Sequence, residues 1–416
     1  MSVDFRLAPT TEAGQVFVSR CEKHASDFVD RAAEHDREAS FPKENIAALG
    51  GDSVMSAPLP EEFGGLGVES VTDLAIGVSR LANGDPATAL TVTMHLGPCW
   101  AASRSWRQAV LREDRDAVNA FSLLLEAVGH HGCILCGAGT EPGTHTRFPQ
   151  SEIRRVDDGW LLNGQKIFVT MSPMATLFNV FCRTKGPDGS WLAARAWVHR
   201  DADGLELVEN WDGLGMRATG SHTVRFHDVV LPELMVGVRG VWGEWTAGEI
   251  VHSIGGNLAQ IATYIGIAEH ARNLVRETLV HRRKAPSGRL LAERHAVQTG
   301  FAEIETHISV ARAILERTGR TWDAFLSRTD DDIEFDEAHQ AMAEYQIAKS
   351  IVEKHAIGAV DVAMTLSGGS GYYNSNPLSR LYRDVRAGPF MQPFSPMELA
   401  EYVGKVRLGL EPTVDL

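Results

Sequence analysis

The chain is poor in cysteine and in positive charge. Only 5 of its 416 residues are cysteine, and 40 Lys and Arg face 54 Asp and Glu, a formal net charge of −14. A nucleic-acid-binding protein needs a cationic surface, and a peripheral membrane protein usually presents basic residues to anionic lipid. We therefore expect neither nucleic-acid nor membrane binding, although a local basic pocket could hold an anionic cofactor.

Long apolar runs are also lacking. No run reaches the roughly 18 residues that a membrane-spanning helix requires. The first residues, MSVDFRLAPTTEAGQ, have neither the basic nor the apolar segment of a secretory signal, so we expect a cytoplasmic protein. Hydrophobic residues make up 44% and charged residues 23% of the chain, as in ordinary globular proteins, and the length predicts two or three structural units.

Motifs for metal, redox and nucleotide chemistry are weak. Cys133 and Cys136 form a C-x-x-C pair, but GCILCGAG is typical of a short apolar strand, and no second such pair completes a zinc site. We expect no metal. Gly213 to Ala218 fits the pattern G-x-G-x-x-A, but a strand-like run follows it where a dinucleotide site needs a helix.

The hydrophobic period divides the chain into three parts. Up to about residue 130, apolar residues recur at helical spacing. Short β-type runs separated by turns follow, and from about residue 240 apolar residues again recur at helical spacing over long segments. We predict an α+β, mainly α fold with an N-terminal helical domain (1–130), a middle antiparallel β-domain (131–238) and a C-terminal four-helix bundle (239–416). Within the β-domain, Asp157-Asp158-Gly159 predicts a turn, and Asn163-Gly164 predicts a hairpin because a type I′ turn needs positive φ at both central residues.

Several strings occur in a distinctive order between residues 60 and 384. They are PEEFGGLG (60–67), TEPG (140–143), LNGQKIFVT (162–170), FHDVVLP (226–232) and GGSGYYNSNPLSRLYRD (368–384). With these strings and its three parts, the chain resembles the acyl-CoA dehydrogenase superfamily of FAD enzymes over nearly its whole length. The resemblance implies that fold, a bound FAD, and a homodimer or homotetramer whose flavin sites are completed across subunits.

The resemblance also implies contacts of the β-domain with the flavin. Thr140 would meet the pyrimidine edge, and Thr146 would lie near the phosphates or the substrate. Phe168, in place of the family's usual tryptophan, and Thr170 would lie against the isoalloxazine ring. The plainer alternatives are a core position for Phe168 and an ordinary strand position for Thr170.

A second set of implied contacts belongs to the helical bundle. Arg282 would reach the pyrophosphate of a neighbouring subunit's FAD, and Gly368 and Gly369 would let the backbone approach the same group. A solvated helix end is the alternative for Arg282. Ala285 and Pro286 replace a phenylalanine and a glycine of the family, which puts the adenosine-side contacts in doubt.

The positions of the family's catalytic base hold no carboxylate. In the family, a glutamate removes the α-proton of an acyl-CoA. It lies eight residues after the Arg-Asp pair matched by Arg383 and Asp384, or ten residues before the glycine matched by Gly266. Those positions are Gln392 and Gly256, and neither side chain can accept the proton as a general base.

Three functions remain open at this point. The favoured one is an oxygenase-type member, in which reduced flavin and oxygen form a C4a-hydroperoxide that hydroxylates nitrogen or carbon of a small molecule. Gln392 would then orient the substrate or the hydroperoxide inside an apolar wall of Phe390, Met391, Pro393 and Phe394, with Phe394 near the flavin.

The first alternative is an acyl-CoA dehydrogenase or related acyl-CoA enzyme with a relocated base, for which Glu249 and Glu398 are the nearest candidates. The second alternative is a catalytically weak flavin-binding subunit. A flavin reductase or an electron-transfer flavoprotein is a possible partner.

Overall fold

Helices form the first part of the chain. The computed structural model describes residues 6–157 and 159–413. The elements here are α1 (Glu12–Glu38), α2 (Lys43–Gly51), α3 (Val71–Ala82), α4 (Pro86–Leu111) and α5 (Arg115–Gly129). Side chains at their starts satisfy backbone N–H groups: Thr11 accepts from Gly14 and Ser70 accepts from Asp73.

The middle part is a sheet whose strands follow the order β6-β7-β3-β2-β4-β5-β8, with β1 beside β4. Its strands are β1 (Leu135–Ala138), β2 (Glu152–Val156), β3 (Gly159–Val169), β4 (Leu177–Lys185), β5 (Trp191–His199), β6 (Leu205–Val208), β7 (His222–Leu231) and β8 (Val236–Val241). Most pairs are antiparallel, as predicted. However, β4 runs parallel to β1 and to β2, so the sheet is mixed rather than purely antiparallel.

The predicted hairpin at Asn163-Gly164 is wrong. Both residues lie inside β3, at an irregularity in its pairing with β7. The Asn163 side chain there exchanges hydrogen bonds with Asp228, and Gly164 has φ +145° and lies so close to Ser151 that a Cβ would come 2.3 Å from its Oγ. The Asn163-Gly164 pair therefore marks a β-bulge and a position where the backbone lies close to Ser151. The chain reverses instead between β2 and β3, where Val156 pairs with Gly159; Asp158 of this turn lies outside the described residues.

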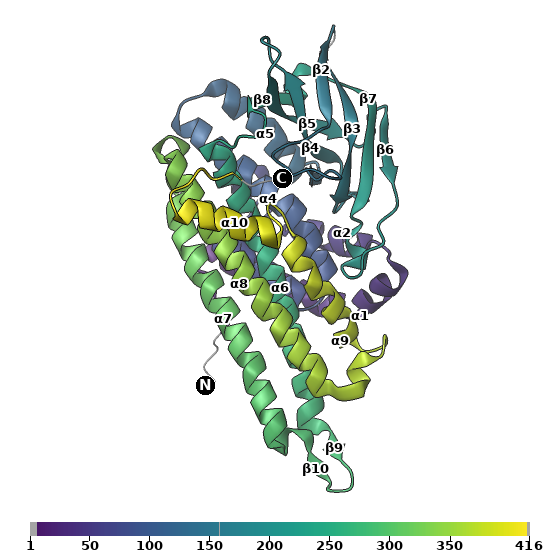
Figure 1. Cartoon of the computed structure of the whole chain (residues 1–416). Coiled ribbons are helices and arrows are strands. Elements are labelled where there is room, and N and C mark those ends of the chain that lie inside the picture. Colours follow the sequence, from purple (N-terminus) through teal and green to yellow (C-terminus); the bar gives the residue numbers. More distant parts are fainter. Residues whose placement is uncertain (1–5, 158, 414–416) are drawn as a thin grey trace.

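The last part is built on three long helices, α6 (Ala247–His281), α7 (His295–Leu326) and α8 (Phe335–Ser367). The hairpin β9 (Arg283–Lys284) and β10 (Arg289–Leu290) joins α6 to α7, and α9 (Pro377–Asp384) and α10 (Pro396–Arg407) pack against α8. Figure 1 shows the sheet at one end of the molecule and the β9–β10 hairpin at the other. No helix within the described ranges is long and apolar enough to span a bilayer.

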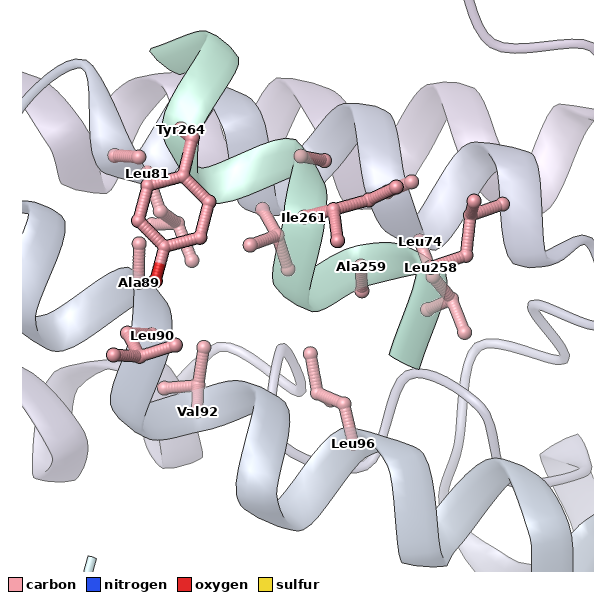
Figure 2. Close-up of a cluster of buried hydrophobic side chains, with 14 of the residues drawn as sticks. Leu74, Leu81, Ala89, Leu90, Val92, Leu96, Leu258, Ala259, Ile261 and Tyr264 are labelled. Carbon is pink, nitrogen blue, oxygen red and sulfur yellow. The ribbon is translucent and has the colours of Figure 1, made fainter. Parts of the chain in front are cut away.

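One continuous core joins the first and last parts. Figure 2 shows Leu74 and Leu81 of α3 and Leu90 and Leu96 of α4 converging on α6 around Ile261. Glycines permit the closest contacts: a Cβ at Gly266 would lie 2.2 Å from the Ser79 carbonyl oxygen of α3. Burial of these apolar side chains, worth about 25 cal/mol per Å², holds α6 against α3 and α4, so its N-terminal end is placed beside the sheet.

Candidate functional site

Gln392 lies in the short connection between the 3₁₀ helix Val385–Phe390 and α10. Buried side chains from two parts of the chain hold this connection. The Lys349 ammonium of α8 donates hydrogen bonds to the carbonyl oxygens of Met391 and, at 2.7 Å, of Phe394. His145 Nε2, from the loop after β1, donates to the Pro393 carbonyl oxygen at 2.7 Å. Residues on both sides of Gln392 are therefore fixed to the bundle and to the β-domain.

The amide of Gln392 has an unused hydrogen-bonding atom. The residue is half-buried, and its Oε1 is buried without a hydrogen-bond partner in the described structure. A buried acceptor that binds nothing costs about 1–3 kcal/mol, so such atoms in native proteins need an explanation. A ligand that carries a donor would provide one.

Aromatic side chains back this connection. Phe394 is fully buried and stacks on His145, with centroids 5.2 Å apart, and on Tyr402, 4.6 Å apart. Trp245, just before α6, lies 5.6 Å from Phe394. Phe390, expected in the same apolar wall, is instead 67% exposed. Phe394 thus supports the connection from the core side.

The second base position, Gly256, lies where α6 crosses α4. A Cβ built on Gly256 would be 3.4 Å from the Cα of Gly97, so the two backbones pack with no side chain between them. A longer side chain at residue 256 would meet the α4 backbone. Glycine therefore supplies no carboxylate at this crossing, although a Cβ there would meet α4 only at ordinary contact distance.

Glu249 and Glu398, the predicted relocated bases, both cap helices. Glu249 Oε2 accepts from Thr246 N at 3.0 Å at the start of α6, and Glu398 Oε2 accepts from Ser395 N at 2.7 Å at the start of α10. In each case the reciprocal bond of a capping box is present. Their carboxylates are engaged in holding helix ends.

The sequence analysis missed one buried carboxyl group near this connection. Glu353 lies one turn after Lys349 on α8, is 5% exposed, and has an Oε1 without a hydrogen-bond partner in the described chain. Burial raises its pKa to about 7, against the opposing effect of the Lys349 ammonium. The sequence feature that could have indicated it is a Lys and a Glu four residues apart, next to the apolar residues Ala348 and Val352 on the same helix.

The structure brings together the β-domain residues expected at the flavin ring. The Thr140 carbonyl oxygen accepts from Ile167 N at 2.9 Å, which places the TEPG string beside the end of β3. Phe168 there has φ +53°, is 58% exposed, and meets Trp211 edge to face. Thr170 is buried, and its hydroxyl lies 2.7 Å from that of Ser221. An exposed aromatic ring in a strained backbone conformation is a suitable surface for a flat cofactor.

A buried ion pair, also missed from the sequence, joins the two strings. Glu141 of TEPG pairs with the fully buried Lys166 of β3 and accepts hydrogen bonds from Gln150 N, Ser151 N and the Ser151 hydroxyl. Burial by itself raises the pKa of Glu141, but Lys166 and these bonds hold it below its ordinary value. The pair closes the loop 141–151, which contains Thr146. That residue is half-buried and makes no side-chain hydrogen bond within the described residues.

The bundle residues expected at the cofactor also lie together, at the C-terminal end of α6. Arg282 ends α6, and its Nη1 lies 3.5 Å from the hydroxyl of Ser370, next to Gly368 and Gly369. All three predicted residues are exposed, and Gly368 has φ +67°. The 35 residues of α6 separate this set from Trp245 by about 50 Å. Figure 1 shows it near the β9–β10 end, opposite the sheet.

A flavin fits these two sets in different ways. Thr140, Phe168 and Thr170 offer a ring surface and polar groups, and Arg282 with the free backbone of Gly368 and Gly369 offers an anion contact. The residues present in both sets therefore fit a flavin, the first its ring and the second its phosphates.

Comparison with known proteins identifies the family. The chain matches the family models described as acyl-CoA dehydrogenase N-terminal domain (residues 11–105), middle domain (136–229) and C-terminal domain (258–394). It is 33% identical to the amino sugar nitrososynthase DnmZ of Streptomyces peucetius, over 96% of this chain and 95% of the relative. It is 34% identical to the L-evernosamine nitrososynthase of a Micromonospora species, over 99% and 94%.

A solved structure agrees with these matches. KijD3 in complex with FMN and dTDP-3-amino-2,3,6-trideoxy-4-keto-3-methyl-D-glucose has a TM-score of 0.88 and 31% identity, covering 97% of this chain and 96% of that one. The predicted fold and flavin chemistry are confirmed, and the preference for an oxygenase-type member agrees with these relatives. The chain belongs to the acyl-CoA dehydrogenase family.

Proposed function

We propose that the chain is a flavin-dependent N-oxygenase that acts on an amine carried by a small molecule. The observation that carries the proposal is the amide of Gln392, whose buried Oε1 is unpaired at the position of the family's base. The capping roles of Glu249 and Glu398 and the lack of a side chain at Gly256 support it. The nitrososynthase relatives point to the same chemistry.

Gln392 suits an amine substrate for an electrostatic reason. An amine attacks oxygen only through a free lone pair, so it must be neutral. A carboxylate at residue 392 would stabilise the ammonium form and raise the amine pKa, whereas an amide does not. The Gln392 oxygen accepts one N–H of the neutral amine, and Lys349 and His145 hold the backbone on both sides of Gln392.

The reaction balances with one oxygen molecule in each step. A reduced flavin would supply two electrons for the activation of dioxygen. The amine, O₂, two electrons and two protons give a hydroxylamine and water. A second O₂ with two further electrons and protons converts the hydroxylamine to the nitroso compound and two waters. The electrons require a partner, and a flavin reductase fits this role better than an electron-transfer flavoprotein, because this enzyme consumes reducing equivalents.

The exposed position of the Arg282 set, at the β9–β10 end of the bundle, supports a homodimer or a homotetramer. Arg282, Gly368 and Gly369 of one subunit would contact the phosphate end of the flavin held by Thr140, Phe168 and Thr170 of another. FAD is long enough to need both sets, whereas FMN would rely mainly on the β-domain set.

A second candidate function rests on Glu353. A carboxyl group with a pKa of about 7 is a suitable general base near neutral pH. An acyl-CoA dehydrogenase that uses Glu353 in place of the usual glutamate would be reduced by acyl-CoA in the absence of oxygen. The N-oxygenase would not.

The test combines this reduction assay with two variants of Gln392. With a flavin reductase and a dTDP-linked 3-amino sugar, the wild-type protein should form the hydroxylamine and nitroso products, detected by mass spectrometry. Gln392→Ala should lower kcat about tenfold or more through loss of one buried hydrogen bond. Gln392→Glu should shift the rise of activity to higher pH, because its carboxylate favours the ammonium form.

Gln15→Ala, an exposed change on α1, is the matched control. Bleaching of the flavin by acyl-CoA without oxygen, or unchanged kcat and pH profile in both Gln392 variants, would refute the proposal.

A further inference from the structure

Two arginines lie side by side on the face of the sheet that packs against α4 and α5. In the pairing of β5 with β8, Arg195 is directly opposite Gly237, so both residues belong to one face. The guanidinium of Arg239 lies over Gly237, where a Cβ would be 3.7 Å from Arg239 Nε. On the same face of β5 and β4, Trp197 and Leu177 pack against α4 and α5. Figure 1 shows β8 and β5 on the side of the sheet near α5.

Polar atoms on this face lack partners. Arg195 lies over the ring of Phe181, 3.0 Å from its centroid, and its Nη1 is buried without a hydrogen bond. Asn179, two residues before Phe181 on β4 and on the same face, has a buried Oδ1 that is also unpaired. Among the described residues, neither Arg195 nor Arg239 forms an ion pair or a side-chain hydrogen bond. A buried charged donor is costly to leave unpaired.

The surroundings do not neutralise the two guanidinium groups. Glu249 is the carboxylate with the strongest electrostatic effect on Arg195, and it is committed to the capping box of α6. Burial lowers the pKa of Arg195 to about 10, with Arg239 acting in the same direction, so Arg195 remains charged at neutral pH. His252, one turn into α6, has its pKa lowered to about 4 by burial and is neutral. The face therefore carries two adjacent guanidinium groups, that of Arg195 with a buried Nη1 and that of the exposed Arg239, and neither bonds directly to a carboxylate among the described residues.

We propose that Arg195, Arg239 and Asn179 form the subsite for a diphosphate group of the substrate, with Asn179 binding a hydroxyl or N–H donor next to it. Two guanidinium groups match a doubly charged anion, and each can form paired hydrogen bonds with phosphate oxygens. The substrate class is thus a nucleoside diphosphate conjugate. This rests on the proposed function, because the subsite lies beside the start of α6, the helix that carries Gly256.

Two diphosphate sources are compatible with these contacts, a nucleotide sugar and coenzyme A. The experiment measures binding of dTDP, coenzyme A and thymidine to the purified protein by isothermal titration calorimetry. It uses wild-type protein and the variants Arg195→Gln, Arg239→Gln and Arg225→Gln. Arg225 is the control, because it lies on β7 and pairs with Glu206 at the surface.

Each outcome supports or overturns the subsite. We expect Arg195→Gln and Arg239→Gln to weaken binding of the preferred diphosphate at least about tenfold, with Arg225→Gln within twofold and thymidine unaffected. The diphosphate that binds more tightly identifies the source. Binding of neither diphosphate, or equal affinity in all variants, overturns the proposal.

Thermal unfolding separates loss of binding from loss of structure. Among the described residues Arg195 contacts the ring of Phe181 but forms no hydrogen bond or ion pair. Arg195→Gln should therefore unfold close to the wild-type temperature without ligand, and lose most of the increase in Tm that the diphosphate produces in the wild type.

The binding test involves no turnover. If dTDP binds through Arg195 but no amine is oxidised, the proposed function fails and the subsite stands. If amines are oxidised while Arg195→Gln binds dTDP normally, the subsite fails and the proposed function stands.

Discussion

The buried pair of Glu141 and Lys166 gives a sharp test of how the loop 141–151 is held. Lys166→Met removes the ammonium and keeps an apolar chain of similar length. Glu141, only 6% exposed, would keep its bonds from Gln150 N at 2.6 Å, Ser151 N at 2.9 Å and the Ser151 hydroxyl at 2.7 Å. Its carboxylate would lose the one cation paired with it.

The expected cost follows from leaving a charge buried alone. Removal of one partner of a buried ion pair costs about 3–5 kcal/mol. Glu141→Gln combined with Lys166→Met removes both charges, so the double variant should be more stable than Lys166→Met alone. The coupling between the two changes should amount to about 1–3 kcal/mol. The double variant should also bind flavin more tightly than Lys166→Met alone, because the loop positions Thr140 and Thr146.

Urea unfolding at several pH values measures the free energy of unfolding of the wild type and of these variants. The pKa of Glu141 is lowered in the folded protein, so its contribution to stability is full at neutral pH and is lost as the pH falls through its folded value. Without Lys166 the pKa of Glu141 rises, so the variant should lose less stability on acidification than the wild type. A cost below about 1 kcal/mol for Lys166→Met, with no coupling to Glu141→Gln and an unchanged pH dependence, would show that the pair does not hold the loop.

Two further predictions concern the cofactor and the pH dependence. Arg282→Ala should lower the flavin content and the affinity for FAD more than for FMN, measured by fluorescence titration; equal losses for both would contradict contact with the far end of FAD. The folded pKa of Glu353, about 7, exceeds its ordinary 4.5. Stability should therefore fall as the pH rises between these values, by about 3 kcal/mol for 2.5 units. Glu353→Gln should flatten this slope in urea unfolding, and an unchanged slope would mean that Glu353 is already ionised at low pH.

The fold was largely predictable because periodicity and turn residues are local signals. The long apolar stripes of α6, α7 and α8 follow directly from the helical period. The exception, Asn163-Gly164, shows the limit of a local signal. The same two residues suit a hairpin turn and a bulge, and the pairing of β3 with β7 through Asp228 decided between them.

The candidate site was predictable only in part. The position of Gln392 came from a count along the chain, but its unpaired oxygen depends on Lys349 and His145, which come from distant elements. Glu249 and Glu398 qualified as bases by their charge, and only helix geometry shows that each caps a helix.

The sequence by itself determined the three-part organisation, the family resemblance and the lack of a carboxylate at the usual base positions. Those properties depend on residue type and order, which are explicit in the chain. Only the tertiary structure decided that Glu353 is buried, that Arg195 and Arg239 share one face, and that Arg282 lies beside Ser370 at the far end of α6. The physical reason is that burial, pairing and distance are set by contacts between residues far apart in sequence.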